Sequence, residues 1–326
     1  MASRRSFVAG ALALLAAPLA AQEKGAPRVV RVGVLDPLPL AANGANFEQL
    51  KKGLREAGYA EGKNLVFEYR ASEGRGSRYR EYAAELTKLP VDILVARGTV
   101  ATIHAKTASD AIPIVAIALT DPVDTGLVGS LERPGGNVTG IAVLIRDVET
   151  RRVDVLRALA PKAKRIVAMI NMGNPAFAIE WKFIDAAAKG FKLEAELLDV
   201  RRPRQIPAAF EAAVAHRAEA LVVQLGALEP EQRQTVVDLA AKHRLPAIYT
   251  ARSYVDAGGL VSYGVDFGQL FYRAAYFVDK VLKGAKPAEL AMEQPSKFEL
   301  IINRKTLRAL DLVIPPDLLL RSNAII

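Results

Sequence analysis

Residues 111–140 read AIPIVAIALTDPVDTGLVGSLERPGGNVTG and combine an apolar run, a polar exit and a glycine turn. The run 112–118 predicts a strand buried on both faces, as in parallel sheets that helices cover. It is followed by Thr120, Asp121 and Pro122. Ligands of open α/β sheets bind beyond the carboxyl ends of the strands, so these residues are candidates for a ligand-binding site. We expect 112–118 to be the last strand of its lobe and the turn at 133–137 to direct the chain to a second lobe.

Apolar runs alternate with amphipathic stretches on both sides of this segment, which predicts an α/β fold with parallel sheets and right-handed crossovers. Before residue 120 we expect strands at 31–35, 65–69, 92–96 and 112–118, and helices at 46–57, 78–88 and 99–108. After residue 145 we expect helices at 150–159, 176–189, 206–216 and 229–243, and strands at 165–170, 192–199, 220–224 and 246–249. Two serial α/β halves indicate two similar lobes with a ligand cleft between them.

The N-terminus predicts export. Arg4 and Arg5 precede a short apolar run, and small residues follow around Ala21, so residues 1–21 read as a removable signal peptide. The spacing from Ser3 to Phe7 resembles a twin-arginine signal, and an ordinary secretory leader remains the alternative. Either one places the mature chain outside the cytoplasm, and we expect it in the periplasm.

The composition excludes several classes of function. The chain of 326 residues has no cysteine, which rules out disulfides, thiolate metal sites and cysteine nucleophiles. Its net charge of +9 is spread along the sequence without an aromatic-interleaved basic stripe, so we expect no nucleic-acid partner. No apolar stretch reaches the roughly 20 residues of a membrane span, so we expect no insertion of the mature chain. The sequence suggests no cofactor or metal.

Catalytic patterns are missing as well. No serine has the glycine spacing of a nucleophile elbow, and no HExxH pattern exists. The three histidines, His104, His216 and His243, all fall in expected helices. A periplasmic α/β hydrolase would need a nucleophile–base pair that the sequence does not show, and we therefore expect no enzyme.

Three separated stretches carry a family resemblance. These are 31–35, RVGVL; 54–70, LREAGYAEGKNLVFEYR; and 298–316, FELIINRKTLRALDLVIPP. Together with 111–140 they resemble, in the right order, the ABC-transporter substrate-binding family that includes tryptophan- and tyrosine-type binding proteins. The resemblance implies the type I periplasmic binding protein fold, a small-molecule ligand and a permease in the inner membrane as partner. We expect the protein to be a monomer.

With the resemblance, the lobes can be delimited. We expect a first crossing between lobes at 140–143 and a return crossing at 258–264 that feeds a helix at 266–283 back onto lobe one. The last elements, 297–303 and 304–310, finish lobe two, as the resemblance implies. Lobe one is then 28–141 plus 264–288, and lobe two is 142–263 plus 289–326.

Polar residues at strand ends form the candidate site of lobe one. Gly98 and Thr99 begin a helix directly after a strand, and the free amides of a helix N-terminus suit a carboxylate. Thr99 as a plain helix cap is the alternative. Thr120 and Asp121 follow the next strand, where Asp121 would hold an ammonium or else close a turn before Pro122. Asp36 follows the first strand, and it too could either contact the ligand or have only a structural role.

The candidate residues of lobe two also follow strands and should face the same cleft. They are Asn171, Asn174, Gln224, Tyr249 and Arg252, together with Tyr263 and Asp266 at the return crossing between the lobes. The prediction is therefore a periplasmic solute-binding component of an ABC importer that takes a small carboxylate or an amino-acid-like ligand by hinge closure. An aromatic ligand is implied by resemblance only. A ligand-sensing subunit of a signalling receptor remains an alternative, as does, less favoured, the hydrolase.

Overall fold

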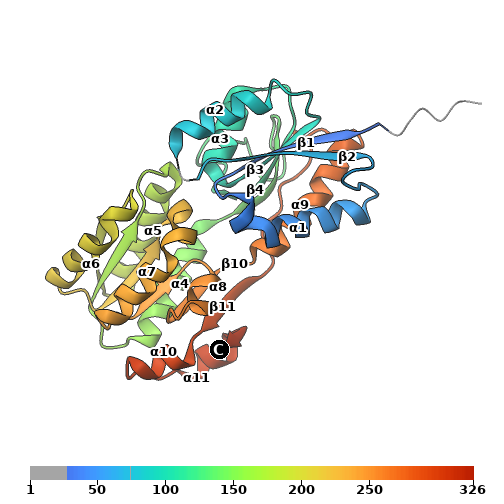
Figure 1. The fold of residues 1–326 in the computed structure, drawn as a ribbon. Coiled ribbons are helices and arrows are strands. Elements are labelled where there is room, and N and C mark those ends of the chain that lie inside the picture. Colours follow the sequence, from blue (N-terminus) through green and yellow to red (C-terminus); the bar gives the residue numbers. More distant parts are fainter. Residues whose placement is uncertain (1–27, 74) are drawn as a thin grey trace, which may run out of the picture.

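The computed structural model describes residues 28–73 and 75–326, which form two lobes (Figure 1). The predicted signal peptide lies outside these residues. The sheet of lobe one is parallel throughout and has the order β2-β1-β3-β4-β5. Its strands are β1 (Val30–Asp36), β2 (Leu65–Ala71), β3 (Ile93–Arg97), β4 (Ile114–Thr120) and β5 (Val138–Val143). Four of these five strands lie where the alternation of the sequence predicts them.

Helices cover both faces of this first sheet. One face packs against α1 (Leu40–Glu56) and α9 (Phe267–Leu282), through side chains such as Leu50 and Phe271 that solvent does not reach. The opposite face packs against α2 (Gly76–Leu86) and α3 (Gly98–Ala108). Because both faces are covered, the strands read as continuous apolar runs rather than alternating ones.

The sheet of lobe two has the order β12-β11-β10-β9-β8-β6-β7, with β11 antiparallel to β10. Its strands are β6 (Arg165–Ile170), β7 (Glu194–Asp199), β8 (Ala220–Gln224), β9 (Ala247–Tyr249), β10 (Val261–Val265), β11 (Phe298–Ile302) and β12 (Ala324–Ile325). Its helices are α4 (Ile145–Leu159), α5 (Pro175–Gly190), α6 (Ile206–Ala215), α7 (Glu229–Lys242), α8 (Arg252–Asp256), α10 (Arg304–Ala309) and α11 (Pro316–Arg321), with 3-10 turns at Pro203–Gln205 and Gly226–Leu228. The helices α4 and α5 contribute to the core on one face, and α6 and α7 to the core on the other.

The strand β5 corrects the sequence prediction. We expected 112–118 to be the last strand of lobe one and 140–143 to cross between lobes, but Val138–Val143 pairs with β4 as a fifth strand. The register shifts between Ala116 and Leu119, and Gly140 has a φ of +124°. A glycine inside a strand next to an irregular pairing is easily read as a turn, because it interrupts the apolar pattern.

The other crossings between the lobes also lie at different residues from those predicted. The segment around Ser262 and Tyr263 is β10, an inner strand of the lobe two sheet, so the chain returns to lobe one only at Asp266. After α9, the Glu293 N–H donates to the Gly140 carbonyl and the Glu293 carbonyl accepts from Ala142. This pairing keeps the chain on lobe one through residue 293. By these contacts lobe one comprises 28–143 and 266–293, and lobe two comprises 144–265 and 298–326.

Candidate functional site

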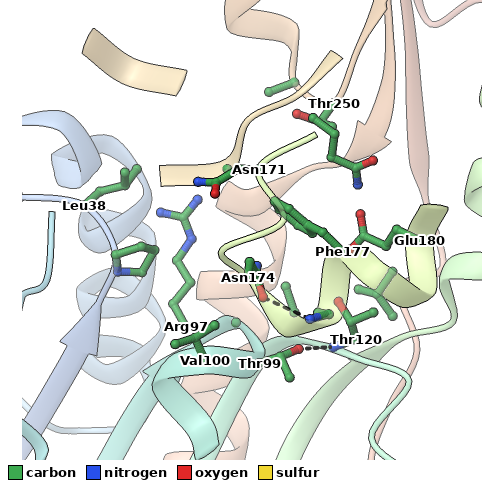
Figure 2. Close-up of a pocket in the computed structure, with 18 of the residues that line it drawn as sticks. Leu38, Arg97, Thr99, Val100, Thr120, Asn171, Asn174, Phe177, Glu180 and Thr250 are labelled. Carbon is green, nitrogen blue, oxygen red and sulfur yellow. Dashed lines mark hydrogen bonds between the residues drawn. The ribbon is translucent and has the colours of Figure 1, made fainter. Parts of the chain in front are cut away.

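A cavity of about 540 Å³ lies between the lobes, at the carboxyl ends of the strands of both sheets. Figure 2 shows Arg97, Thr99 and Thr120 of lobe one around the same space as side chains of lobe two, among them Phe177 and Glu180. This size is typical of small-molecule sites, which hold ligands between domains with a few convergent polar groups. Six of the predicted residues line it: Gly98, Thr99, Thr120, Asn171, Asn174 and Gln224.

Lobe one contributes hydrogen-bond donors. Gly98 has a φ of +80°, which lets α3 begin directly after β3. The Thr99 Oγ1 accepts a hydrogen bond from the Thr120 N–H at 3.1 Å (Figure 2). A hydroxyl that accepts still has its own proton to donate. Together with the unpaired amides of the first turn of α3, these groups suit a ligand oxygen that carries negative charge.

Arg97 adds a cation to the same wall of the cavity. Its guanidinium lies 4.4 Å from the centre of the Phe267 ring and 3.4 Å from the Asp36 carboxylate. Asp36 is fully buried behind Arg97, where it also accepts from Asn43 at 2.8 Å. Burial raises the pKa of Asp36, and the charge of Arg97 opposes that rise. Asp36 was predicted as a ligand contact, but the structure makes it the partner that holds Arg97 in place.

Lobe two contributes a polar loop and the end of a strand. The Asn174 side chain accepts from the Ala176 N–H at 3.1 Å and caps α5. Asn171 Oδ1 accepts from the Gly173 N–H at 3.1 Å, which closes the turn after β6. At the end of β8, Gln224 is 3% exposed, and its Oε1 has no hydrogen-bond partner among the described residues. That oxygen can therefore accept a hydrogen bond from a ligand.

A buried ion pair lies behind Gln224. Glu149 and Arg152 are one turn apart on α4 and pair directly, and Glu149 is fully buried. The Gln224 Nε2 donates to Glu149 at 3.4 Å, and the Arg152 Nε donates to the Tyr263 carbonyl at 2.8 Å. Burial raises the pKa of Glu149 to about 7, against the lowering effect of Arg152.

We expect this carboxyl to make stability depend on pH. Because its pKa is higher in the folded chain than its ordinary value of 4.5, folding binds a proton between these values. The free energy of unfolding is therefore highest, as far as Glu149 affects it, below about pH 4.5. It decreases by up to about 3 kcal/mol as the pH rises through 7. Melting temperatures at pH 5 and pH 8 should differ more in the native protein than in Glu149→Gln, which has no charge at either pH. Equal differences in both proteins would contradict this assignment.

Asp121 does not line the cavity. It was predicted to hold a ligand ammonium, but it has a φ of +37° and is 7% exposed. Its carboxylate accepts from the N–H of Ile145, in the first turn of α4, and burial raises its pKa. The positive φ turns the side chain away from the strand direction and onto the crossing between lobes. The structure therefore gives Asp121 a positional role at this crossing.

Four further predicted residues, three of lobe two and Asp266 at the start of α9, also lie away from the cavity. Tyr249 is 1% exposed and stacks on Tyr254 in the core, with ring centres 4.5 Å apart. Arg252 lies outside and pairs with Asp256. Tyr263 stacks on the Phe298 ring, and Asp266 accepts from the Gln269 N–H as the cap of α9. Residues at strand ends are thus as often part of a core or a helix cap as they are part of the cavity wall.

Two other features are absent from residues 28–73 and 75–326. No group of three or more His, Asp or Glu side chains is arranged to hold a metal ion there. No helix in that part of the chain is long and apolar enough to cross a membrane.

The comparisons with known proteins agree with this geometry. The family model of ABC transporter substrate binding proteins matches residues 31–326. The chain belongs to this family. Among curated relatives of this substrate-binding protein, the tyrosine-binding protein of Clostridioides difficile is 28% identical over 261 residues, which are 80% of this chain and 75% of that protein.

Solved structures show the same architecture. The ABC domain from Streptococcus pneumoniae in complex with L-Trp matches with a TM-score of 0.84 and 26% identity, over 91% of this chain and 100% of that chain. A conserved domain protein from Vibrio cholerae matches with a TM-score of 0.85 and 26% identity, over 92% and 100%. The predicted two-lobe α/β fold and the family resemblance are thereby confirmed.

Membership also decides between binding and catalysis, because the family consists of substrate-binding proteins rather than enzymes. The hydrolase alternative is dropped on that ground. The cavity of this substrate-binding protein is also lined by several residues that were not predicted: Arg97, Arg152, Phe177, Glu180 and Arg233. Apart from Arg97, which ends β3, they lie within helices, where the sequence pattern does not reveal which face meets a cleft.

Proposed function

We propose that this substrate-binding protein is the solute-binding component of an ABC importer and captures an amino acid or a similar small carboxylate. The observation that carries the proposal is the cavity of about 540 Å³ lined by both lobes. A relative named for tyrosine and a structural neighbour that holds L-Trp support an amino acid as the ligand class. The N-terminal leader read from the sequence supports action in the periplasm, with a membrane permease as partner.

The polar groups on the two walls suit opposite ends of a zwitterion. On lobe one, Thr99, Thr120 and Arg97 offer donors and positive charge, so we assign the carboxylate of the ligand to them. On lobe two, the Gln224 Oε1 and the Glu180 carboxylate offer acceptors, so we assign the ammonium to them. The sequence predicted Asp121 as the ammonium site. We assign the ammonium to the opposite wall instead.

The mechanism is hinge closure. Three chain segments join the lobes, near Leu144, near Asp266 and at 294–297, and short connections of this kind allow rigid lobes to rotate. A ligand can contact both walls at once only in the closed form. These contacts therefore stabilise the closed form relative to the open one. The closed protein would then dock on the permease as a monomer.

The direct test is a binding screen of the mature chain against amino acids and small organic acids. A ligand at about 100 times its Kd should stabilise the protein by about 2.7 kcal/mol, which raises the melting temperature measurably. Small-angle scattering should show a smaller radius of gyration with that ligand. The proposal fails if no compound of these classes shifts the melting temperature. Co-purification with a sensor kinase rather than a permease would point to the signalling alternative.

Thr120→Val tests the carboxylate wall. Valine keeps the shape of threonine but loses the hydroxyl, so we expect the affinity to fall about tenfold, the worth of roughly one hydrogen bond to a charged group. Titration calorimetry with the ligand found in the screen measures the change. Thr107→Val, on the exposed end of α3, removes a hydroxyl that bonds only to Ile103 and should leave affinity unchanged. Equal affinity of the two variants would remove Thr120 from the site.

A further inference from the structure

The arginines of the cavity differ in one respect. Among those that line it, Arg97, Arg152 and Arg201 each pair with a carboxylate of the described chain. These partners are Asp36, Glu149 and Asp199. The fourth, Arg233, forms no ion pair and no hydrogen bond with any residue that the structure describes. Its positive charge therefore lies on the cavity wall without a counterion from the described chain.

Burial makes this arrangement costly for the empty protein. Arg233 is partly buried on α7, and its Nε is shielded from solvent without a hydrogen-bond partner. A guanidinium does not lose its proton in proteins, so the group cannot lower the cost by becoming neutral. A partly buried charge that lacks a partner lowers the stability of the empty protein, and an anion that reaches it removes this cost.

A second unsatisfied group lines the same cavity. Gln224 is buried to 97%, and its Oε1 has no partner among the described residues, while its Nε2 is engaged by Glu149. Lobe two therefore presents an acceptor at Gln224 and a charged donor at Arg233, beside the carboxylate of Glu180. A ligand ammonium can donate to the Gln224 oxygen, but it leaves Arg233 unpaired.

We propose that the ligand carries an anionic group in addition to its amino-acid carboxylate, and that Arg233 binds this second group. The inference rests on the proposed function and narrows its ligand class to acidic amino acids or their close analogues. It separates this protein from the neighbour that holds L-Trp, whose ligand has a neutral side chain. A guanidinium offers a planar fork of donors, so a carboxylate and a phosphate both fit it.

The test compares pairs of ligands in which only one member carries the second anionic group. Glutamate against glutamine, aspartate against asparagine, and 4-carboxyphenylalanine against phenylalanine probe a carboxylate, and O-phosphoserine against serine probes a phosphate. We expect the anionic member of at least one pair to bind ten times more tightly or better, as charge-assisted hydrogen bonds predict. The affinity of that member should weaken with rising salt more than the affinity of its neutral partner.

Variants of Arg233 then locate the effect. Arg233→Gln should abolish the preference for the anionic member, Arg233→Lys should retain part of it, and the ligand-free variants should melt at or above the native temperature. Lys242→Gln, at the exposed end of the same helix, removes one charge far from the cavity and should keep the preference. Neutral amino acids binding as well as acidic ones, or an unchanged preference in Arg233→Gln, would overturn this inference and leave the proposed function standing. Binding of neither class would overturn both.

Discussion

Gly140→Ala is expected to lower the melting temperature by roughly 10 °C. A Cβ at this position would lie 2.2 Å from the Ala116 carbonyl oxygen and 2.7 Å from the Ala116 nitrogen, so backbone atoms of β4 would have to move. The φ of +124° adds strain, because side chains rarely adopt it. Overpacking and strain together amount to about 3 kcal/mol or more, and each kcal/mol corresponds to about 2–4 °C in a domain of this size.

The matched control is Gly136→Ala, four residues earlier in the same connection. Its Cβ would meet only the flexible end of Lys106 at 3.8 Å, so we expect almost no change in melting temperature. Differential scanning calorimetry of both variants gives the comparison. Similar melting temperatures for the two variants would show that β4 and β5 are not held as closely as the structure indicates.

Arg152→Met is expected to destabilise the protein by about 3 kcal/mol or more at pH 8. The substitution leaves the Glu149 carboxylate buried without its partner and removes the donor to the Tyr263 carbonyl. At pH 5 the loss should be smaller, because burial already favours the protonated form of Glu149. Chemical denaturation at the two pH values measures the difference.

Two further variants separate charge from packing. Glu149→Leu combined with Arg152→Met replaces the whole pair by apolar groups and should recover most of the loss. Arg157→Met, on the same helix, breaks an exposed pair with Asp154 and should cost less than about 1 kcal/mol. If the double variant is no more stable than Arg152→Met alone, burial of an unpaired carboxylate is not the cause.

The regular parts of the fold could be predicted because their patterns are local. Arg165–Ile170 and Ala220–Gln224 were predicted to the residue, since an apolar run between polar ends determines a buried strand by itself. The strand β5 could not be predicted in this way. Gly140 is required by contact with Ala116, twenty-four residues earlier, and nothing near Gly140 in the sequence reveals that contact.

In the candidate site, too, local patterns predict some residues, and others depend on contacts that are distant in the sequence. Thr99 and Asn174 could be found because they follow strands and begin helices, a position that topology places at the cleft. Asp121 follows a strand too, but a backbone turn directs it to the amide of Ile145. Glu180 and Arg233 lie inside helices, so their exposure to the cavity depends on how the two lobes pack, which no local pattern contains.

The helix α9 has a consequence for the order in which the protein is made. It covers Phe47, Leu50 and Leu54 of α1, yet it is synthesised after most of lobe two. Until residue 282 leaves the ribosome, this face of the first sheet stays open to solvent and its core is incomplete. The first lobe to be translated is therefore completed only after most of the second, and a chain cut short within the second lobe would expose apolar surface in both.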